Sequence, residues 1–200
     1  MRKFKALFIV AMFAVTAMVS AQSTSFGVKG GLGISNLYGG DVENAKAIIG
    51  FNIGVFGDYE FAPGVGIQSG LSYVTKGAKY TDTEDNESAS VNYGYLQLPV
   101  HFAYKTEVTP GTRIVFHAGP YAAYALSGKM KYGSISVDIF DKDVMTDGVF
   151  KRFDAGLGLG VGAEFGRIVV DLGWDMGLLE VAKDSEVKNQ SGYLSIGYKF

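Results

Sequence analysis

Residues 154–165 read DAGLGLGVGAEF, with glycine at every second position from Gly156 to Gly162 and an apolar residue after each glycine. The spacing from Gly158 to Ala163 matches the G-x-G-x-x-A fingerprint of a dinucleotide-binding loop, but that loop joins a strand to a helix. Glycine at strict period two destabilises a helix, and a second alternating run follows directly. The stretch therefore predicts a β-strand with an empty face and an apolar face rather than a phosphate-binding loop.

The same alternation recurs along the rest of the chain. A period of two is typical of strands that have one face in an apolar environment. Eight such runs are present, an even number that lets an antiparallel sheet close on itself. We expect strands over residues 26–34, 49–61, 65–73, 96–104, 114–126, 153–165, 168–178 and 194–200.

The segments between these runs alternate in length. The short ones span residues 62–64, 105–112 and 166–167, and the long, polar ones span 35–47, 81–90, 127–151 and 181–191. Short turns at one end and long loops at the other are the plan of an outer-membrane barrel, and an N-terminus on the periplasmic side would turn the long loops outward. Within the third long loop, residues 134–139 alternate again and predict a strand pair that extends beyond the membrane.

The two faces of the sheet can be assigned from their volume. A closed eight-stranded barrel has an interior just wide enough for its side chains, and the bulky apolar faces would overfill it. Glycines and polar residues fit there instead, and the glycine face of residues 154–165 leaves room for side chains such as Phe56, Tyr95 and Tyr121. Aromatic residues near both ends of the apolar faces are typical of the two membrane interfaces. The prediction is an all-β, eight-stranded, antiparallel, up-and-down transmembrane β-barrel rather than a soluble ligand carrier.

The N-terminus has the pattern of a secretory signal peptide. Arg2, Lys3 and Lys5 form a basic start, residues 6–19 are mostly apolar, and Ala21 supplies the small residue that precedes a cleavage site. We expect residues 1–21 to be a signal peptide that is cleaved off, and residues 22–200 to form one barrel domain in the cell outer membrane.

Composition excludes several classes of function. The chain has no cysteine, which excludes thiol catalysis and a disulfide framework. Its formal net charge of −2 becomes more negative without the basic N-terminus, which argues against a nucleic-acid partner. Nothing in the pattern indicates a cofactor.

Polar and charged residues of both signs occupy the face that we assign to the lumen. Buried charges must be paired or hydrated, so we interpret them as a hydrogen-bonded network that braces the barrel; the alternative is a narrow hydrated path. The candidate lumen network consists of Lys29, Asn52, Gln68, Gln97, His101, Arg113, His117, Glu164, Asp171 and Asp175, with Asp58, Lys76 and Lys199 on the same face.

Catalytic and metal sites are not indicated by these residues. His101 and His117 are the only histidines and are predicted on neighbouring strands, but no carboxylate has a ligand-like spacing from them. Ser72 faces inward, yet nothing in the sequence ties it to either histidine as a nucleophile to its base. The acidic stretch at residues 82–87 and the aspartates at residues 138, 141 and 143 do not match a calcium-binding EF-hand.

Two prolines fall in the middle of predicted strands. Pro99 and Pro120 each remove a donor from the hydrogen-bond ladder, at a similar height on adjacent strands. A local bulge explains them; the alternative is a weak seam in the wall that binds a partner or a lipid.

Three motifs carry a family resemblance. The stretches YLQLPVHFAYK from Tyr95, AGPYAAYAL from Ala118 and the glycine-rich strand at residues 154–165 resemble, in this order, motifs of the PorT-like outer-membrane β-barrel domain family. The resemblance covers residues 22–200 and implies the barrel fold. It names no catalytic or binding residue, so no site is carried over.

The sequence favours an integral outer-membrane protein that is non-enzymatic and serves as a structural or interaction scaffold through its extracellular loops. The alternatives are a small porin-like channel for ions or small solutes and an outer-membrane lipid-modifying enzyme. The expected partners are outer-membrane lipid, a protein bound by the long loops, and the barrel-assembly machinery during biogenesis. For the last of these, the terminal stretch YLSIGYKF, ending at Phe200, resembles an assembly signal.

Overall fold

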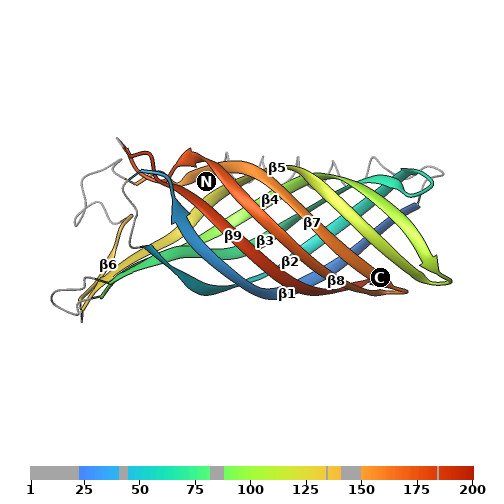
Figure 1. Cartoon of the computed structure of the whole chain (residues 1–200), viewed down its shortest axis with the longest axis horizontal. Helices are drawn as coiled ribbons and strands as arrows, with labels where there is room; N and C mark the ends of the chain where they lie inside the picture. Colours follow the sequence, from blue (N-terminus) through green and yellow to red (C-terminus); the bar gives the residue numbers. More distant parts are fainter. Residues whose placement is uncertain (1–22, 41–44, 82–87, 134, 141–149, 184) are drawn as a thin grey trace, which may run out of the picture.

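The elements of the described chain are β-strands, as the period-two alternation predicts (Figure 1). The computed structural model describes residues 23–40, 45–81, 88–133, 135–140, 150–183 and 185–200. The expected signal peptide lies outside these residues. Within them the strands are β1 (Ser23–Tyr38), β2 (Ala45–Ala62), β3 (Val65–Thr81), β4 (Ser88–Thr109), β5 (Thr112–Tyr132), β6 (Ile135–Asp138), β7 (Phe153–Phe165), β8 (Ile168–Glu180) and β9 (Lys188–Lys199).

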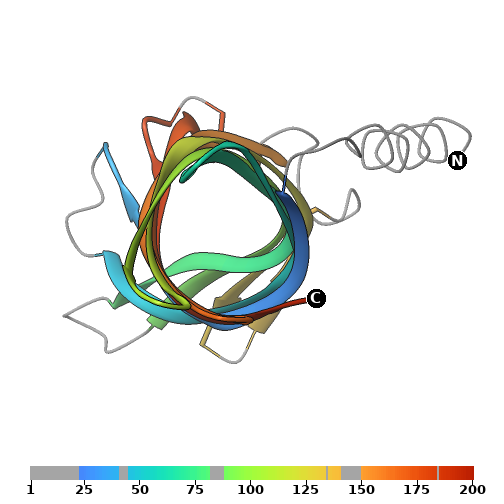
Figure 2. The same ribbon diagram turned by 90° about the vertical axis from the view of Figure 1, so that its right-hand side faces the viewer.

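Eight of these strands close into a ring, which confirms the predicted barrel (Figure 2). Each strand pairs antiparallel with its neighbour in the sequence, except that β5 pairs with β7 past the short β6. The ring closes between the first and last strands, where Gly27 lies opposite Lys199 and Tyr38 opposite Lys188. A closed ring leaves none of its eight strands with an unpaired edge inside a membrane.

Burial confirms the assignment of the two faces. On β7, Leu157, Leu159 and Val161 are exposed, whereas Asp154 and Glu164 are almost fully buried. The other strands of the ring show the same pattern of exposed apolar and buried polar side chains. This inversion of a soluble protein's burial pattern fits an outer wall that contacts lipid. In the described residues, no helix is both long and apolar enough to cross a membrane.

The strands of one side of the barrel continue beyond the lipid-facing wall, which the sequence pattern missed. β4 has 22 residues and β5 has 21, although about 9–11 residues suffice to cross a membrane. Their extensions were predicted as loops because a face in contact with water needs no apolar alternation. As predicted for residues 134–139, a short strand pairs there: β6 lies against Lys129–Tyr132 of β5.

The short turns lie together at the opposite end of the barrel, where the C-terminus also lies (Figure 1). Gly64, Gly111 and Gly166 occupy these turns with positive φ angles of 72°, 79° and 58°, a conformation that glycine adopts without strain. The connector predicted over residues 105–112 is mostly strand, because the β4–β5 ladder continues until Thr109 lies opposite Thr112.

Candidate functional site

The lumen side chains form three layers along the barrel axis, named here from the short-turn end to the long-loop end. The basal ion cluster comprises Asp58, Glu60, Lys105, Arg113, Glu164 and Lys199. The central chamber is lined by Lys29, Asn52, Gln97, His101, His117, Asp171, Asp175 and neighbouring residues. The tyrosine layer comprises Lys76, Tyr93, Tyr95, Tyr121, Asp154 and Asn189.

The basal ion cluster joins charges from five strands across the lumen. Arg113 donates from Nη2 to Glu164 at 2.8 Å and from Nη1 to Glu60 at 3.1 Å. Lys199 donates to the other oxygen of Glu164 at 2.5 Å, and Lys105 donates to Asp58. Three cations therefore balance three carboxylates in mutual contact, the arrangement in which buried charges are tolerated.

Sequence reasoning found part of this cluster and missed two members. Arg113 and Glu164 were predicted to face the lumen, and Gln68 joins them there by donating to Asp58 at 3.3 Å. Lys105 was missed because residues 105–112 were predicted to be a connector. The period of two could have identified Lys105, because the inward positions of β4 continue in steps of two from His101 to Lys105. Glu60 was missed although it follows Asp58 by the same step.

Two histidines and an aspartate form a buried chain in the central chamber. The Nδ1 atoms of His101 and His117 lie 2.9 Å apart, and the rings are stacked with 14° between their planes. His117 Nε2 lies 2.8 Å from Asp171 Oδ1. A carboxylate favours a proton on the nitrogen it faces, so in a neutral pair His117 donates to Asp171 and accepts a hydrogen bond from His101. Lys29 lies near the end of this chain, 3.8 Å from Asp171.

The glycine face of β7 makes room for this histidine pair. A Cβ atom added at Gly158 would lie 2.8 Å from His101 Nε2 and 2.6 Å from Asp175 Oδ1. A Cβ at Gly160 would lie 2.5 Å from His117. The sequence predicted that the glycine face would accommodate large side chains such as Phe56, but it did not predict the histidines. The ring of Phe56 packs instead against Gly27 on β1.

The central chamber encloses space for a few water molecules. Its cavity has a volume of about 80 Å³, whereas a single water needs roughly 10–15 Å³ measured in this way. Gln97 donates to Asp175 at 2.8 Å, and Ser195 donates to Asn52 at 2.9 Å. The ten predicted lumen residues all face the interior, and the chamber or the basal ion cluster contains each of them.

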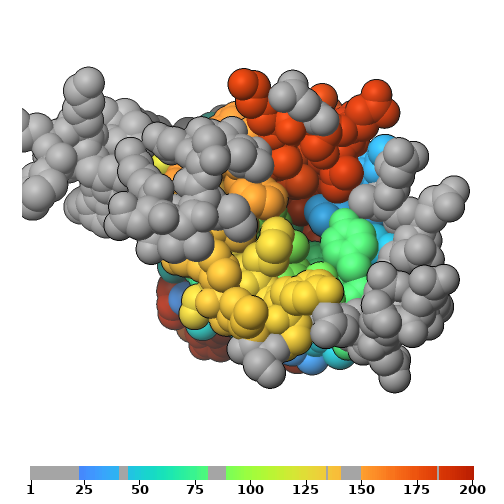
Figure 3. All heavy atoms as spheres, turned by 90° about the vertical axis from the view of Figure 1, so that its left-hand side faces the viewer, coloured from blue at the N-terminus to red at the C-terminus, as the bar shows by residue number. Residues whose placement is uncertain are grey.

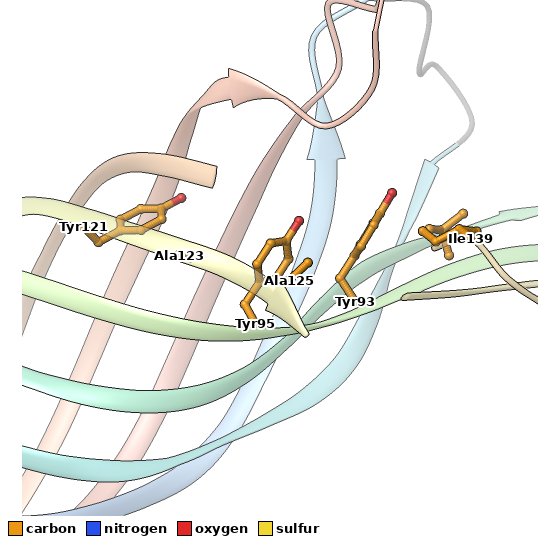
Figure 4. Close-up of a cluster of buried hydrophobic side chains, with 7 residues drawn as sticks. Tyr93, Tyr95, Tyr121, Ala123, Ala125 and Ile139 are labelled. Atoms are coloured by element: carbon orange, nitrogen blue, oxygen red, sulfur yellow. The ribbon is translucent and has the colours of Figure 1, made fainter. Parts of the chain in front are cut away.

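The tyrosine layer lies in the lumen toward the long-loop end, which is the end of the molecule that Figure 3 shows. Tyr93 and Tyr95 on β4 and Tyr121 on β5 are at most 3% exposed, and their hydroxyl groups point the same way (Figure 4). The ammonium of Lys76 lies 4.4 Å from the centre of the Tyr121 ring and 3.8 Å from Asp154. A cation over an aromatic face and next to a carboxylate is stabilised by both.

Hydrogen bonds hold the polar ends of this layer together. Tyr121 donates to Asp154 at 3.2 Å, and Asn189 donates to the Tyr95 hydroxyl at 3.2 Å and to Asp154 at 3.3 Å. Sequence reasoning placed Lys76, Tyr95 and Tyr121 on the inward face. It missed Tyr93 and Asn189, because β4 and β9 begin earlier than the apolar alternation indicates.

The histidines have partners that the sequence did not reveal. Asp171, on a strand that β7 separates from the strand of His117, supplies a carboxylate partner that the spacing of residues along the chain had not shown. Even so, the described residues contain no group of three or more His, Cys, Asp or Glu side chains placed to hold a metal ion. Ser72 lies opposite Gln97 in the β3–β4 ladder, and the histidines bond to each other and to Asp171.

The acidic segments are only partly described. Residues 82–87, 141 and 143 lie outside the described part of the chain. Asp138 lies on β6 directly opposite Lys129 of β5.

The ladder is interrupted at the two prolines. The β4–β5 register pairs Pro99 with Tyr121 and resumes only at Phe102 opposite Ala118. The carbonyl oxygen of Pro99 accepts a hydrogen bond from Ser69 Oγ at 2.8 Å. The register is the same on both sides of the gap, so the bulge expected at the prolines is absent; the register shifts of this ladder lie between Gly94 and Tyr95 and between Glu107 and Thr109. The weak seam remains a prediction.

Comparisons with known proteins agree with this architecture. The sequence model of the family described as outer membrane protein beta-barrel domain matches residues 20–182. No curated protein matches the chain.

Several solved structures are similar in fold. A major outer membrane protein from Thermus thermophilus is 18% identical, with a TM-score of 0.50 over 89% of this chain and 100% of its own. Ail of Yersinia pestis, solved in complex with the heparin analogue sucrose octasulfate, is 18% identical, with a TM-score of 0.48 over 89% and 99% of the two chains. OprG from Pseudomonas aeruginosa is 14% identical, with a TM-score of 0.48 over 90% and 98%. At these identities the likeness concerns the fold alone.

Proposed function

Because the chain belongs to the outer membrane protein beta-barrel domain family, we propose that it is a closed, non-enzymatic scaffold of the outer membrane. In this proposal the barrel anchors and positions its long-loop end, where β4, β5 and β6 extend beyond the lipid-facing wall. The partner bound there would be a protein. The barrel itself would carry neither solute nor substrate.

The observation that carries this proposal is that buried, mutually bonded side chains lie in the lumen on both sides of the central chamber. The basal ion cluster crosses the lumen at one end with every charge paired. The tyrosine layer fills it at the other, with Tyr93, Tyr95 and Tyr121 almost fully buried. An ion that crossed the barrel would have to displace both layers and lose its hydration in the process.

The contacts of the histidines support a structural role for them. Three of their four ring nitrogens bond to each other or to Asp171. The fourth, His101 Nε2, is buried and has no hydrogen-bond partner among the described residues, whereas a catalytic base must reach the proton of a nucleophile. Lipid composition should therefore be the same in membranes that contain the native protein and in membranes that contain its His101→Gln, His117→Gln variant. A lipid product that depends on these histidines would contradict the proposal.

Conductance in planar bilayers tests the closed barrel. We expect no stepwise currents from the native protein. The Tyr95→Ala, Tyr121→Ala variant should also stay closed, because the basal ion cluster remains. Adding Glu164→Ala and Lys199→Ala, which removes one charge of each sign from that cluster, should open a path and produce steps.

A small channel is the second candidate function, and the volume of the central chamber, which is large enough for water, favours it. The cavity of about 80 Å³ is lined by charged groups of both signs, including Lys29, Asp171 and Asp175. In that case the native protein would give stepwise currents, and truncating Tyr95 and Tyr121 alone would enlarge them. Either result would overturn the closed scaffold.

The narrower PorT-like assignment is part of this proposal. It is supported by the order of the three motifs, which lie within β4, β5 and β7. These segments include His101 and Gly158, which meet beside the central chamber, and Tyr121, which lies in the tyrosine layer. A motif set of this kind would specify how the lumen is packed.

A further inference from the structure

A row of lysines crosses the extended sheet on its outward face. Lys46 on β2 lies directly opposite Lys79 on β3. Lys79 is in turn opposite Ser90, and Ser90 is opposite Lys131 on β5. Residues directly opposite one another in a sheet point to the same face, and all three lysine side chains are exposed. We call Lys46, Lys79 and Lys131 the lysine row.

The lysine row lies just above the lipid-facing wall. Lys46 is three residues past the exposed Ile49, and Lys131 is five residues past Leu126, the last outward aliphatic side chain of β5. A tilted strand climbs about 2.5 Å per residue along the barrel axis, which places the row roughly 8–13 Å above the apolar band. A lysine side chain can extend back toward the headgroup layer from that height.

The charges of this row are uncompensated within the described part of the chain. Like charges directly opposite each other in a sheet are destabilising, and Lys46 and Lys79 form such a pair. Two other lysines on the long-loop side have a carboxylate partner position. Lys129 lies opposite Asp138 in the ladder, and Lys151 donates to Glu180 at 2.9 Å. The described residues place no carboxylate in ion-pair contact with the lysine row.

From this arrangement we infer that the lysine row binds the phosphate groups of lipids in the leaflet on the long-loop side. Strands lie about 4.8 Å apart, so Lys46 and Lys79 flank one phosphate while Lys131 lies two strands further on, within reach of a second. The hydroxyls of Ser90 and Ser136 lie in line with the lysines and add donors. The site does not depend on whether the lumen conducts.

Native mass spectrometry of the full chain in detergent tests this inference. The probes are lipid A carrying its two phosphates and the same lipid after dephosphorylation. The native protein should retain the phosphorylated lipid and discriminate against the dephosphorylated one. Each lysine near an anionic headgroup contributes about fivefold in affinity, so the Lys46→Gln, Lys79→Gln, Lys131→Gln variant should bind the phosphorylated lipid roughly 100-fold more weakly.

A matched variant controls for net charge. Lys151→Gln, Lys183→Gln and Lys188→Gln together remove the same charge at the same end of the barrel, on and beside β7–β9. This control should bind the phosphorylated lipid like the native protein. Equal loss in both variants, or no loss in the lysine-row variant, would overturn the inference. Competition by millimolar inorganic phosphate that abolished lipid binding would assign the row to a free anion and overturn the lipid assignment.

Discussion

At the scale of single residues, the glycines of β7 are as important for packing in the lumen as the charged side chains opposite them. Gly158 and Gly160 are next to His101, His117 and Asp175, at distances that leave no room for a Cβ atom. The lumen of an eight-stranded barrel has little spare volume, so large rings on one wall require glycine on another. Gly158 and Gly160 therefore mark the part of the wall against which the histidine pair packs.

Filling one of these glycine positions should destabilise the barrel. We expect Gly160→Val to lower the free energy of unfolding by about 1–3 kcal/mol, the usual cost of overpacking, because the new side chain meets His117. Unfolding by urea in detergent, followed by tryptophan fluorescence, would measure the change. Gly30→Ala is the control: its Cβ would lie 3.4 Å from the nearest atom, and its stability should stay within about 0.5 kcal/mol of the native value.

At the scale of the strands, the sequence predicts those parts that contact lipid. The expected bounds of β7 are those of the structure, and β8 differs only by its last two residues. By contrast, β4 begins eight residues before its predicted start at Leu96, because its extension lies outside the apolar band. Apolar and polar residues alternate along a strand where one face contacts lipid and the other faces the lumen. The alternation is lost where both faces of the strand contact water or protein.

The lumen contacts were less predictable than the strands. Period two is enough to place Arg113, His117 and Asp171 on the inward face. It does not give the stagger between strands, which decides which inward residues meet. His117 and Asp171 belong to strands that are separated by β7, so their contact depends on the register of two ladders at once.

The interruption between β4 and β5 gives a prediction at the same scale. The backbone amide of Val100 falls where the β4–β5 ladder skips, so it should exchange with solvent deuterium faster than amides at the same height on β8 and β9. Hydrogen exchange measured by NMR in detergent micelles would show this. Equal protection around the whole ring would rule out a weak seam at Pro99 and Pro120.

At the scale of the whole molecule, the basal ion cluster is a brace across the ring. It links β4, β5 and β7, which are neighbours in the ring, to β2 and β9, which other strands separate from them and from each other. Hydrogen bonds along the ladder hold each strand to two others, whereas Lys105 contacts carboxylates on β2 and β7. Such contacts resist flattening of the barrel.

Loss of this brace should be visible in a heat-modifiable gel shift. The native barrel should migrate compactly in detergent until heated, and Lys105→Met should convert at a lower temperature, because removing one partner of a buried pair costs about 3 kcal/mol. Lys151→Met is the control, since Lys151 pairs with Glu180 on the exposed surface and such pairs contribute little. Equal conversion temperatures for native protein and Lys105→Met would argue against the brace.

The pairing of β1 with β9 also constrains how the protein is made. In the ladder that closes the ring, Gly27 near the start of the first strand lies opposite Lys199, so the ring cannot close before the last strand is present. Until the last strand is present, the polypeptide has two unpaired strand edges and exposed apolar side chains, and both promote aggregation. Closure over so large a separation along the chain is also intrinsically slow. We therefore expect ring closure to be the last step of folding, completed only once the final strand has reached the membrane.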